Sequence, residues 1–95
     1  MSTKDGTVTL RLYGALRQAA GGREVELETP GGTVQELLQR FAARAPRAYE
    51  MLFDREGHLW RSLVLLLNEE PAPERQDTRV QPGDVVSVLV PLAGG

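Results

Sequence analysis

The residues of this sequence whose types point to chemistry are the last two, Gly94 and Gly95. Because glycine has no side chain, such an end can enter a channel too narrow for any other residue and can adopt whatever backbone a partner's site requires. Fully extended, the segment 91–95 reaches up to about 17 Å, enough to place a carboxylate in another protein's active site. Because a carboxylate is a poor electrophile, we expect an ATP-dependent partner to adenylate Gly95. Attack of sulfur on the adenylated carboxyl group would then give a thiocarboxylate.

A Gly-Gly end also has a second interpretation, a frayed terminus without function, because chain ends tolerate change. The fold in front of the dipeptide decides between the two interpretations. A domain whose last strand leads straight into the tail would present the carboxylate to a partner, whereas a long linker would not. No interdomain linker, internal repeat or low-complexity segment precedes residues 91–95.

The composition excludes most other kinds of site. The chain has 95 residues, no cysteine and a single histidine, His58, so thiolate chemistry is absent and imidazole catalysis or metal binding would depend on one side chain. Eleven basic and thirteen acidic residues give a net charge of −2, which provides no large field to hold nucleic acid or an anionic membrane. We expect one domain over residues 1–95 that binds no cofactor or metal and is not an enzyme by itself.

The localisation follows from what the chain lacks. The first residues are polar and do not contain the apolar stretch of a signal peptide, and the longest apolar run, residues 63–67, is too short to span a bilayer. Cytoplasmic residence is therefore the default expectation.

Alternation of apolar and polar residues predicts two strands near the N-terminus. Residues 7–13 alternate in this way, and in residues 24–28 Val25 and Leu27 alternate with glutamates. The connection between them, residues 15–20, has good helix propensity but is too short to nucleate alone, which predicts a single turn of helix. We expect the two strands to pair as a hairpin.

The clearest helix start in the sequence is Thr33 followed by Glu36, the spacing of a capping box. Pro46 ends the predicted helix, because the residue before a proline is pushed out of the helical region. A further short turn is expected over residues 48–53. The apolar positions of the main helix recur on one stripe and are Val34, Leu37, Leu38, Phe41 and Ala45.

The second half of the chain predicts the remaining strands. The continuous apolar run 63–67 is typical of a central strand covered on both faces. Pro71 and Pro73 allow at most a short edge strand between residues 69 and 75. A Pro-Gly-Asp turn then leads into the β-branched run 85–90, which predicts the last strand.

This order, β-β-α-β-(β)-β, predicts an α+β domain of the β-grasp (ubiquitin-like) type. We expect a mixed four- to five-stranded sheet, with the first and last strands parallel in its middle, one main helix on one face, and residues 91–95 as a flexible tail. The second face of the sheet is also partly apolar. Either residues 46–60 cover it, or it is an exposed patch for a partner protein.

The remaining candidates carry weaker signals. Four arginines could form a patch for an acidic partner surface, although scattered arginines are usually only solvated: Arg17, Arg44, Arg47 and Arg61. His58 lies in a charged loop and is assigned an exposed or packing role. Phe53 and Trp60 are interpreted as local core rather than recognition anchors.

With these motifs the sequence resembles the ubiquitin-like sulfur carriers of the MoaD/ThiS family, which include the small subunit of molybdopterin synthase and the thiamine sulfur carrier. The most specific match is residues 81–95, similar to the family's Gly-Asp turn, final strand and Pro-x-x-Gly-Gly end. Further matching stretches are residues 12–21, 33–41 and 64–68. Two features depart from this pattern. The Asn68-Glu69-Glu70 turn replaces a more usual Asn-Gly turn, and an insertion at 55–60 looks more like archaeal-type modifiers and the carrier of protein-thiocarboxylate cysteine synthesis.

The resemblance implies a thiocarboxylate on Gly95, made through an acyl-adenylate by an E1-like enzyme that uses ATP, with Gly94 contributing tail flexibility. As the small subunit of molybdopterin synthase, the protein would act with the large subunit on a cyclic pyranopterin precursor, and the product would be the dithiolene of the molybdenum cofactor. Other sulfur-accepting enzymes remain open as partners, in thiamine, cysteine or tRNA thiolation. So do a protein modifier conjugated through Gly95 and an interaction domain that shares only the fold.

Overall fold

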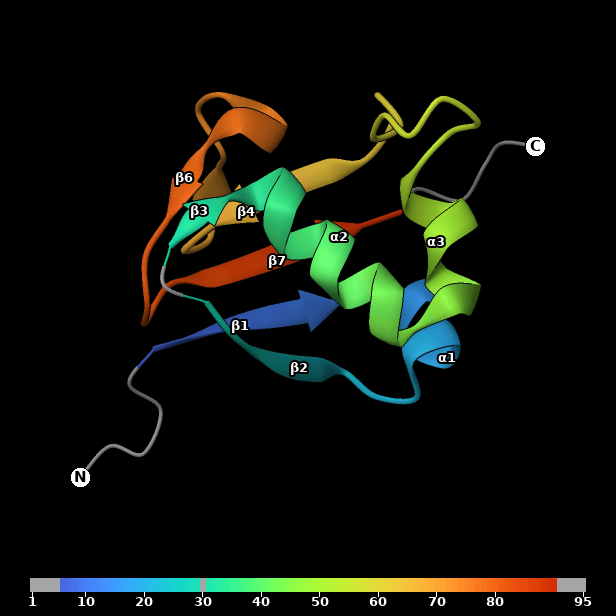
Figure 1. The fold of residues 1–95 in the computed structure, drawn as a ribbon, viewed down its shortest axis with the longest axis horizontal. Helices are drawn as coiled ribbons and strands as arrows, with labels where there is room; N and C mark the ends of the chain where they lie inside the picture. The colour runs from blue at the N-terminus through green and yellow to red at the C-terminus, as the bar shows by residue number, and fades with distance from the viewer. Residues whose placement is uncertain (1–5, 30, 91–95) are drawn as a thin grey trace.

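A five-stranded mixed sheet with helices packed against one face dominates the computed structural model, which describes residues 6–29 and 31–90 (Figure 1). The elements in chain order are β1 (Thr7–Leu12), α1 (Ala15–Ala20), β2 (Glu24–Glu28), β3 (Gly32–Thr33), α2 (Val34–Arg44), α3 (Pro46–Leu52), β4 (Val64–Leu67), β5 (Glu70–Pro71), the 3-10 helix η1 (Arg75–Asp77), β6 (Arg79–Val80) and β7 (Val85–Leu89). The sheet order is β2-β1-β7-β4-β5. The predicted α+β class and β-grasp arrangement are confirmed.

Strand β7 lies in the middle of this sheet. It pairs parallel with β1 and antiparallel with β4, while β1 and β2 form an antiparallel hairpin. The predicted hairpin and the predicted parallel central pair are therefore both correct. A second sheet, the two strands β3 and β6, was not expected, because each of its strands has only two residues and too little sequence to show a pattern.

Helix α2 begins where the capping box predicts. The hydroxyl of Thr33 accepts a hydrogen bond from the Glu36 N–H at 3.2 Å, and Glu36 Oε1 accepts one from the Thr33 N–H at 3.0 Å. This closed box requires glycine in front of it, since a Cβ at Gly32 would lie 2.5 Å from Glu36 Oε1. The helix ends at Arg44, and Pro46 starts α3 at the first helical position, where its missing N–H costs nothing.

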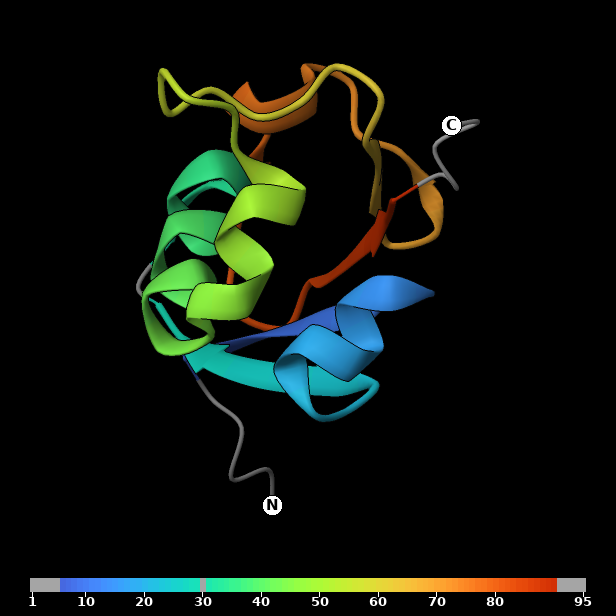
Figure 2. The same ribbon diagram turned by 90° about the vertical axis from the view of Figure 1, so that its right-hand side faces the viewer.

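The helices and one face of the sheet enclose a single hydrophobic core. Helix α3 is part of it, because Ala48 and Leu52 are fully buried; the sequence predicted only a short turn there. Figure 2 shows α2 and α3 beside each other on the same side of the sheet. Within the described ranges, no helix has the length and apolar character needed to cross a membrane.

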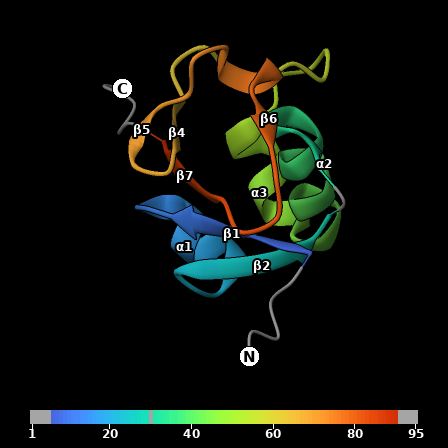
Figure 3. The ribbon, with the colours of Figure 1, turned by 90° about the vertical axis from the view of Figure 1, so that its left-hand side faces the viewer.

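None of the helices in the described residues lies over the opposite face of the sheet, as Figure 3 shows for α2 and α3. The prediction that residues 63–67 are covered on both faces is wrong, because Val64 is 42% exposed. The alternative in which residues 46–60 cover this face is also wrong, since Phe53 and the buried residues of α3 belong to the one core. The prediction failed because apolar residues point to both faces of the sheet in this segment, whereas only Leu63 and Leu65 are buried.

Candidate functional site

Gly94 and Gly95, the residues to which the sequence assigns chemistry, lie outside the described residues, as does the rest of the expected tail, 91–95. The site is therefore described through β7, the strand that leads to them. Val90 follows β7 directly, is half-buried, and packs against the core. The last described residue of the chain thus stands at the end of a strand that is paired on both sides.

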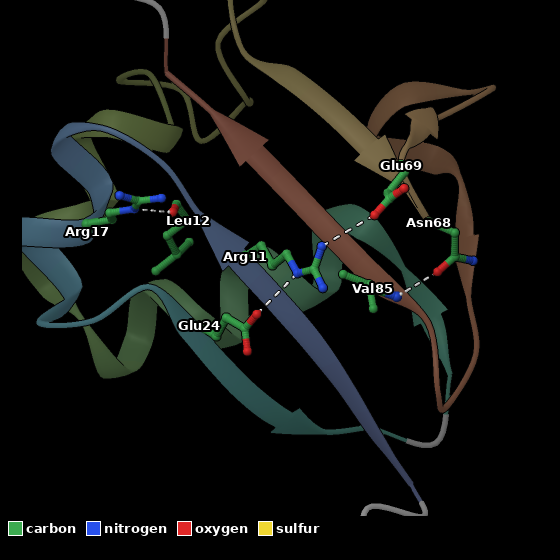
Figure 4. Close-up of polar contacts among 7 residues, drawn as sticks. All are labelled: Arg11, Leu12, Arg17, Glu24, Asn68, Glu69 and Val85. Atoms are coloured by element: carbon green, nitrogen blue, oxygen red, sulfur yellow. Dashed lines mark hydrogen bonds and ion pairs between the residues drawn. The ribbon is translucent and has the colours of Figure 1, made fainter.

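The start of β7 is fixed by the turn between β4 and β5. Asn68 Oδ1 accepts a hydrogen bond from the Val85 N–H at 2.9 Å, and the Asn68 N–H donates to the Val85 carbonyl at 2.7 Å (Figure 4). Its amide also donates to Asp84 Oδ1 at 3.2 Å. Asn68 and Glu69 have φ values of 52° and 73°, in the left-handed region that asparagine tolerates better than most residues. This turn sets the position from which β7 runs toward the tail.

The end of β1 lies beside the end of β7, because Leu12 pairs with Val88. Arg17 of α1 donates from Nε to the Leu12 carbonyl at 2.9 Å, and its guanidinium carbon lies 5.4 Å from the centre of the Tyr13 ring. Both are stabilising contacts within the fold. Arg17, a candidate for partner binding, therefore has a structural task, which is to hold the end of β1.

The segment before β4 lies on the other side of the end of β7, because Val64 pairs with Leu89. Arg75 holds this segment: its guanidinium donates to the Leu63 carbonyl at 2.9 Å and to the Trp60 carbonyl at 3.1 Å. Arg75 has a φ of 50°, which is unusual for a residue other than glycine. Arg75 is not among the predicted site residues, because a lone arginine after a Pro-rich turn gives no pattern by which to find it.

The open face of the sheet is apolar over β4 and β7. Val64 and Leu89 are opposite one another, and Leu66 and Val85 lie on the same face. All four are partly or largely exposed, and none belongs to the core cluster or packs against it. This apolar strip runs up to the residue from which the tail begins, so a protein that holds the tail can also cover the strip.

The open face becomes acidic toward β2, where Glu24, Glu26 and Glu28 alternate with core residues. Arg11 lies between the two halves, with Nε 3.1 Å from Glu24 Oε2 and a terminal nitrogen 3.6 Å from Glu69 Oε2 (Figure 4). The Arg11 side chain is 38% exposed, so these ion pairs contribute little to stability. Their effect is to fix a cation at the border between the apolar and the acidic half.

The loop after α3 is ordered by Asp54. One carboxylate oxygen accepts hydrogen bonds from the Glu56 N–H at 2.8 Å and the His58 N–H at 2.9 Å. The bond from the His58 backbone is the main cause that lowers the pKa of Asp54 from its ordinary value. His58 itself is 71% exposed, and its Nδ1 lies 3.7 Å from Glu56 Oε1, which agrees with the exposed role assigned to it.

The structure separates the four arginines of the predicted patch. Arg17 lies at the end of β1, Arg44 near the β2 edge, Arg47 on the exposed side of α3, and Arg61 in front of β4. Nor does any group of three or more His, Asp or Glu side chains that could hold a metal ion occur in residues 6–29 and 31–90. Phe53 is buried, with only 3% of its surface exposed, as predicted. Trp60 is 43% exposed, so the assignment of Trp60 to the core is wrong.

Comparison with known proteins adds family and fold information to this geometry. The model of the ThiS family matches residues 10–95. SAMP1 from Haloferax volcanii superposes with a TM-score of 0.85 at 25% identity, covering 95% of this chain and 100% of that one. A Pyrococcus furiosus protein described as molybdopterin converting factor subunit 1 gives 0.71 at 26% identity, over 90% and 98%. A chain of the Amycolatopsis orientalis BexX/CysO complex gives 0.71 at 28% identity, over 93% and 99%.

Proposed function

The chain belongs to the ThiS family, the ubiquitin-like sulfur carriers of the MoaD/ThiS type, and on this premise we propose that it carries sulfur as a thiocarboxylate on Gly95. The observation that carries the proposal is the family match, which runs through β7 and the residues after it to position 95. Gly94 adds a second residue without a side chain, so that the end can enter a narrow site. The folded body serves to present this end and does not act as a catalyst by itself.

The chemistry requires a partner that supplies ATP. The Gly95 carboxylate attacks the α-phosphorus of ATP, pyrophosphate leaves, and an acyl-adenylate forms. Sulfur at the sulfide level, as HS⁻ from a donor, then attacks the acyl carbon and AMP leaves, so that one oxygen of the carboxylate is replaced by sulfur. Because this chain has no cysteine, the sulfur must arrive on the partner or on a separate donor.

For the acceptor we propose the pyranopterin precursor of the molybdenum cofactor, with this chain as the small subunit of molybdopterin synthase. The likeness to the Pyrococcus furiosus molybdopterin converting factor subunit 1, at 26% identity, supports this assignment. The large subunit would bind the precursor and receive the tail, while the apolar strip of Val64, Leu66, Val85 and Leu89 offers a surface to dock on.

A second candidate function is protein modification through an isopeptide bond from Gly95 to a lysine of another protein. The likeness to the Haloferax volcanii small archaeal modifier protein 1, with a TM-score of 0.85, supports this alternative. The first chemical step is the same in both, because either route needs the acyl-adenylate. The candidates then diverge: in sulfur donation the thiocarboxylate sulfur attacks the acceptor and water cleaves its bond to the Gly95 acyl carbon, whereas in modification a lysine amine attacks that carbon.

Intact-mass spectrometry tests the shared step. The full chain is incubated with a ThiS-family activating enzyme, ATP and a sulfur donor, and we expect a mass gain equal to the difference between a sulfur and an oxygen atom. A variant that lacks Gly94 and Gly95 is the control and should gain nothing. An unchanged mass of the wild-type chain under conditions that thiocarboxylate another family member would reject the proposal.

Two readouts separate the candidates. Thiocarboxylated protein mixed with molybdopterin synthase large subunit and the cyclic precursor should yield the dithiolene product and return to the unmodified mass. For a modifier, trypsin would leave residues 80–95 on the acceptor lysine, because Arg79 is the last basic residue before the tail. Lysine peptides with this remnant in cells, together with no dithiolene in the reconstituted reaction, would favour modification over cofactor synthesis.

A further inference from the structure

An open hollow of about 890 Å³ lies between the segment 54–62 and η1, apart from the apolar strip of the open face. Trp60 and Arg61 line one side, Arg75 the other, and Gln35 in the first turn of α2 contributes to its wall. In Figure 2 the segment and η1 lie together above α2 and α3. The hollow thus combines two guanidinium groups with an indole that is 43% exposed.

The Trp60 side of this hollow is held rigidly. The Trp60 N–H donates to the Leu52 carbonyl at 3.0 Å, and the indole N–H donates to the Glu50 carbonyl at 3.0 Å. Arg75 binds the Trp60 and Leu63 carbonyls from the other side. A surface fixed on both sides needs little ordering when a partner binds, which favours its use in recognition.

The hollow carries an excess of positive charge, because the guanidinium groups of Arg61 and Arg75 and one carboxylate, that of Asp54, line it. Across residues 6–29 and 31–90, neither Arg61 nor Arg75 has a carboxylate within ion-pair distance. The acidic groups of the segment are engaged instead: Asp54 accepts two backbone N–H bonds, and Glu56 faces His58. The protein as a whole carries a net charge of −2, so a hollow with an excess of positive charge attracts a negatively charged partner group.

The position of the hollow connects it with the tail. Trp60 and Arg61 immediately precede β4, and Val64 of β4 pairs with Leu89 at the end of β7. A protein that takes up the residues after Val90 therefore reaches this segment without passing the body of the domain. The hollow is also open to solvent, so it cannot bury most of a small ligand, whereas a protein segment needs no enclosed cavity.

We propose that this hollow docks a carboxylate-bearing segment of the ATP-dependent enzyme that activates Gly95, an inference that rests on the proposed function. An aspartate or glutamate of that segment pairs with the forked guanidinium of Arg61, in the hollow that Arg75 also lines, and an apolar neighbour packs on Trp60. Arg75 acts as a positioning residue, because its guanidinium holds the segment that carries Trp60 and Arg61. The contact adds affinity for the activating enzyme and takes no part in the chemical step.

Charge reversal at Arg61 tests the proposal, with Arg55→Glu as the matched control in the same loop. Arg61 is exposed and Arg55 does not line the hollow, so both variants should fold and melt like the wild type. We expect Arg61→Glu to raise the KM for the carrier in the activation reaction about tenfold without changing kcat, and Arg55→Glu to stay within about twofold. Arg61→Lys, which keeps the charge but loses the fork, should lie between them.

The outcomes separate the two proposals. If the wild type becomes thiocarboxylated but Arg61→Glu and Arg55→Glu have equal KM values, the docking proposal is wrong and the proposed function stands. A loss in kcat rather than KM for Arg61→Glu would also overturn it, because a docking contact acts on binding. If the wild type gains no sulfur, the proposed function fails and the docking proposal fails with it.

Discussion

The two faces of the central sheet are made by the same strands but differ in their environment. On the helix side Leu10, Val86 and Val88 are completely buried, whereas on the other side Val64 is 42% exposed. Because side chains alternate along a strand, neighbouring residues of β7 face opposite environments. One face of the sheet therefore stabilises the fold, and the other face is available to bind a partner.

Matched leucine truncations on the two faces should have the largest and most unequal effects. Leu10→Ala removes fully buried contacts in the middle of the core and should lower the free energy of unfolding by about 2–5 kcal/mol. Leu66→Ala on the half-buried open face should cost about 1 kcal/mol or less. Urea denaturation followed by circular dichroism measures both. Equal losses of unfolding free energy in the two variants would show that the open face stabilises the fold as much as the core face does.

The turn that fixes the start of β7 gives a prediction of intermediate size. Asn68→Ala removes two side-chain hydrogen bonds and places alanine, which tolerates a positive φ less well than asparagine, at a φ of 52°. We expect the free energy of unfolding to fall by about 1–3 kcal/mol. Asn68→Gly loses the same bonds but adopts this φ freely, so it should be the less destabilised variant. Comparing their urea midpoints isolates the backbone contribution. If both variants matched the wild type, the turn would not anchor β7.

On the open face, Val64→Ala should change stability by well under 1 kcal/mol, because the side chain is already 42% exposed. We expect the same variant to weaken binding to the large subunit of molybdopterin synthase, since the apolar strip loses its most exposed member. Surface plasmon resonance with that subunit measures the change, and Leu66→Ala should behave in the same direction. Unchanged affinity in both variants would mean that the partner leaves this face uncovered.

The sequence was sufficient for the elements that depend on local patterns. The alternation in β1 and β2, and the capping box of Thr33 and Glu36, involve neighbours along the chain, and the structure reproduces them with shifts of a residue or so. The position of α3 was not predictable in this way. Its two buried residues, Ala48 and Leu52, acquire their environment from α1 and α2, which short-range patterns do not encode.

The same limit applies to the site. The family match agrees with the resemblance drawn from residues 81–95, but the roles of Gly94 and Gly95 stay predictions. Trp60 was misassigned to the core because an aromatic residue in a loop gives no sign of which side is covered. Its backbone carbonyl accepts a hydrogen bond from Arg75, a residue far along the chain whose contacts and unusual φ are seen only in the structure.

The smallest expected effect concerns Asp54, which orders the loop beside the proposed docking hollow. The His58 backbone N–H lowers its pKa from the ordinary value of 3.8, so the folded state binds its proton less readily than the unfolded state. The stability that this carboxylate contributes is therefore complete above pH 3.8 and is lost as the pH falls through the lower folded value. Thermal melts of the wild type and of Asp54→Asn should differ by a constant amount near neutral pH and converge below 3.8. A difference that stays constant through the acid range would show that the charge of Asp54 is not what stabilises the loop.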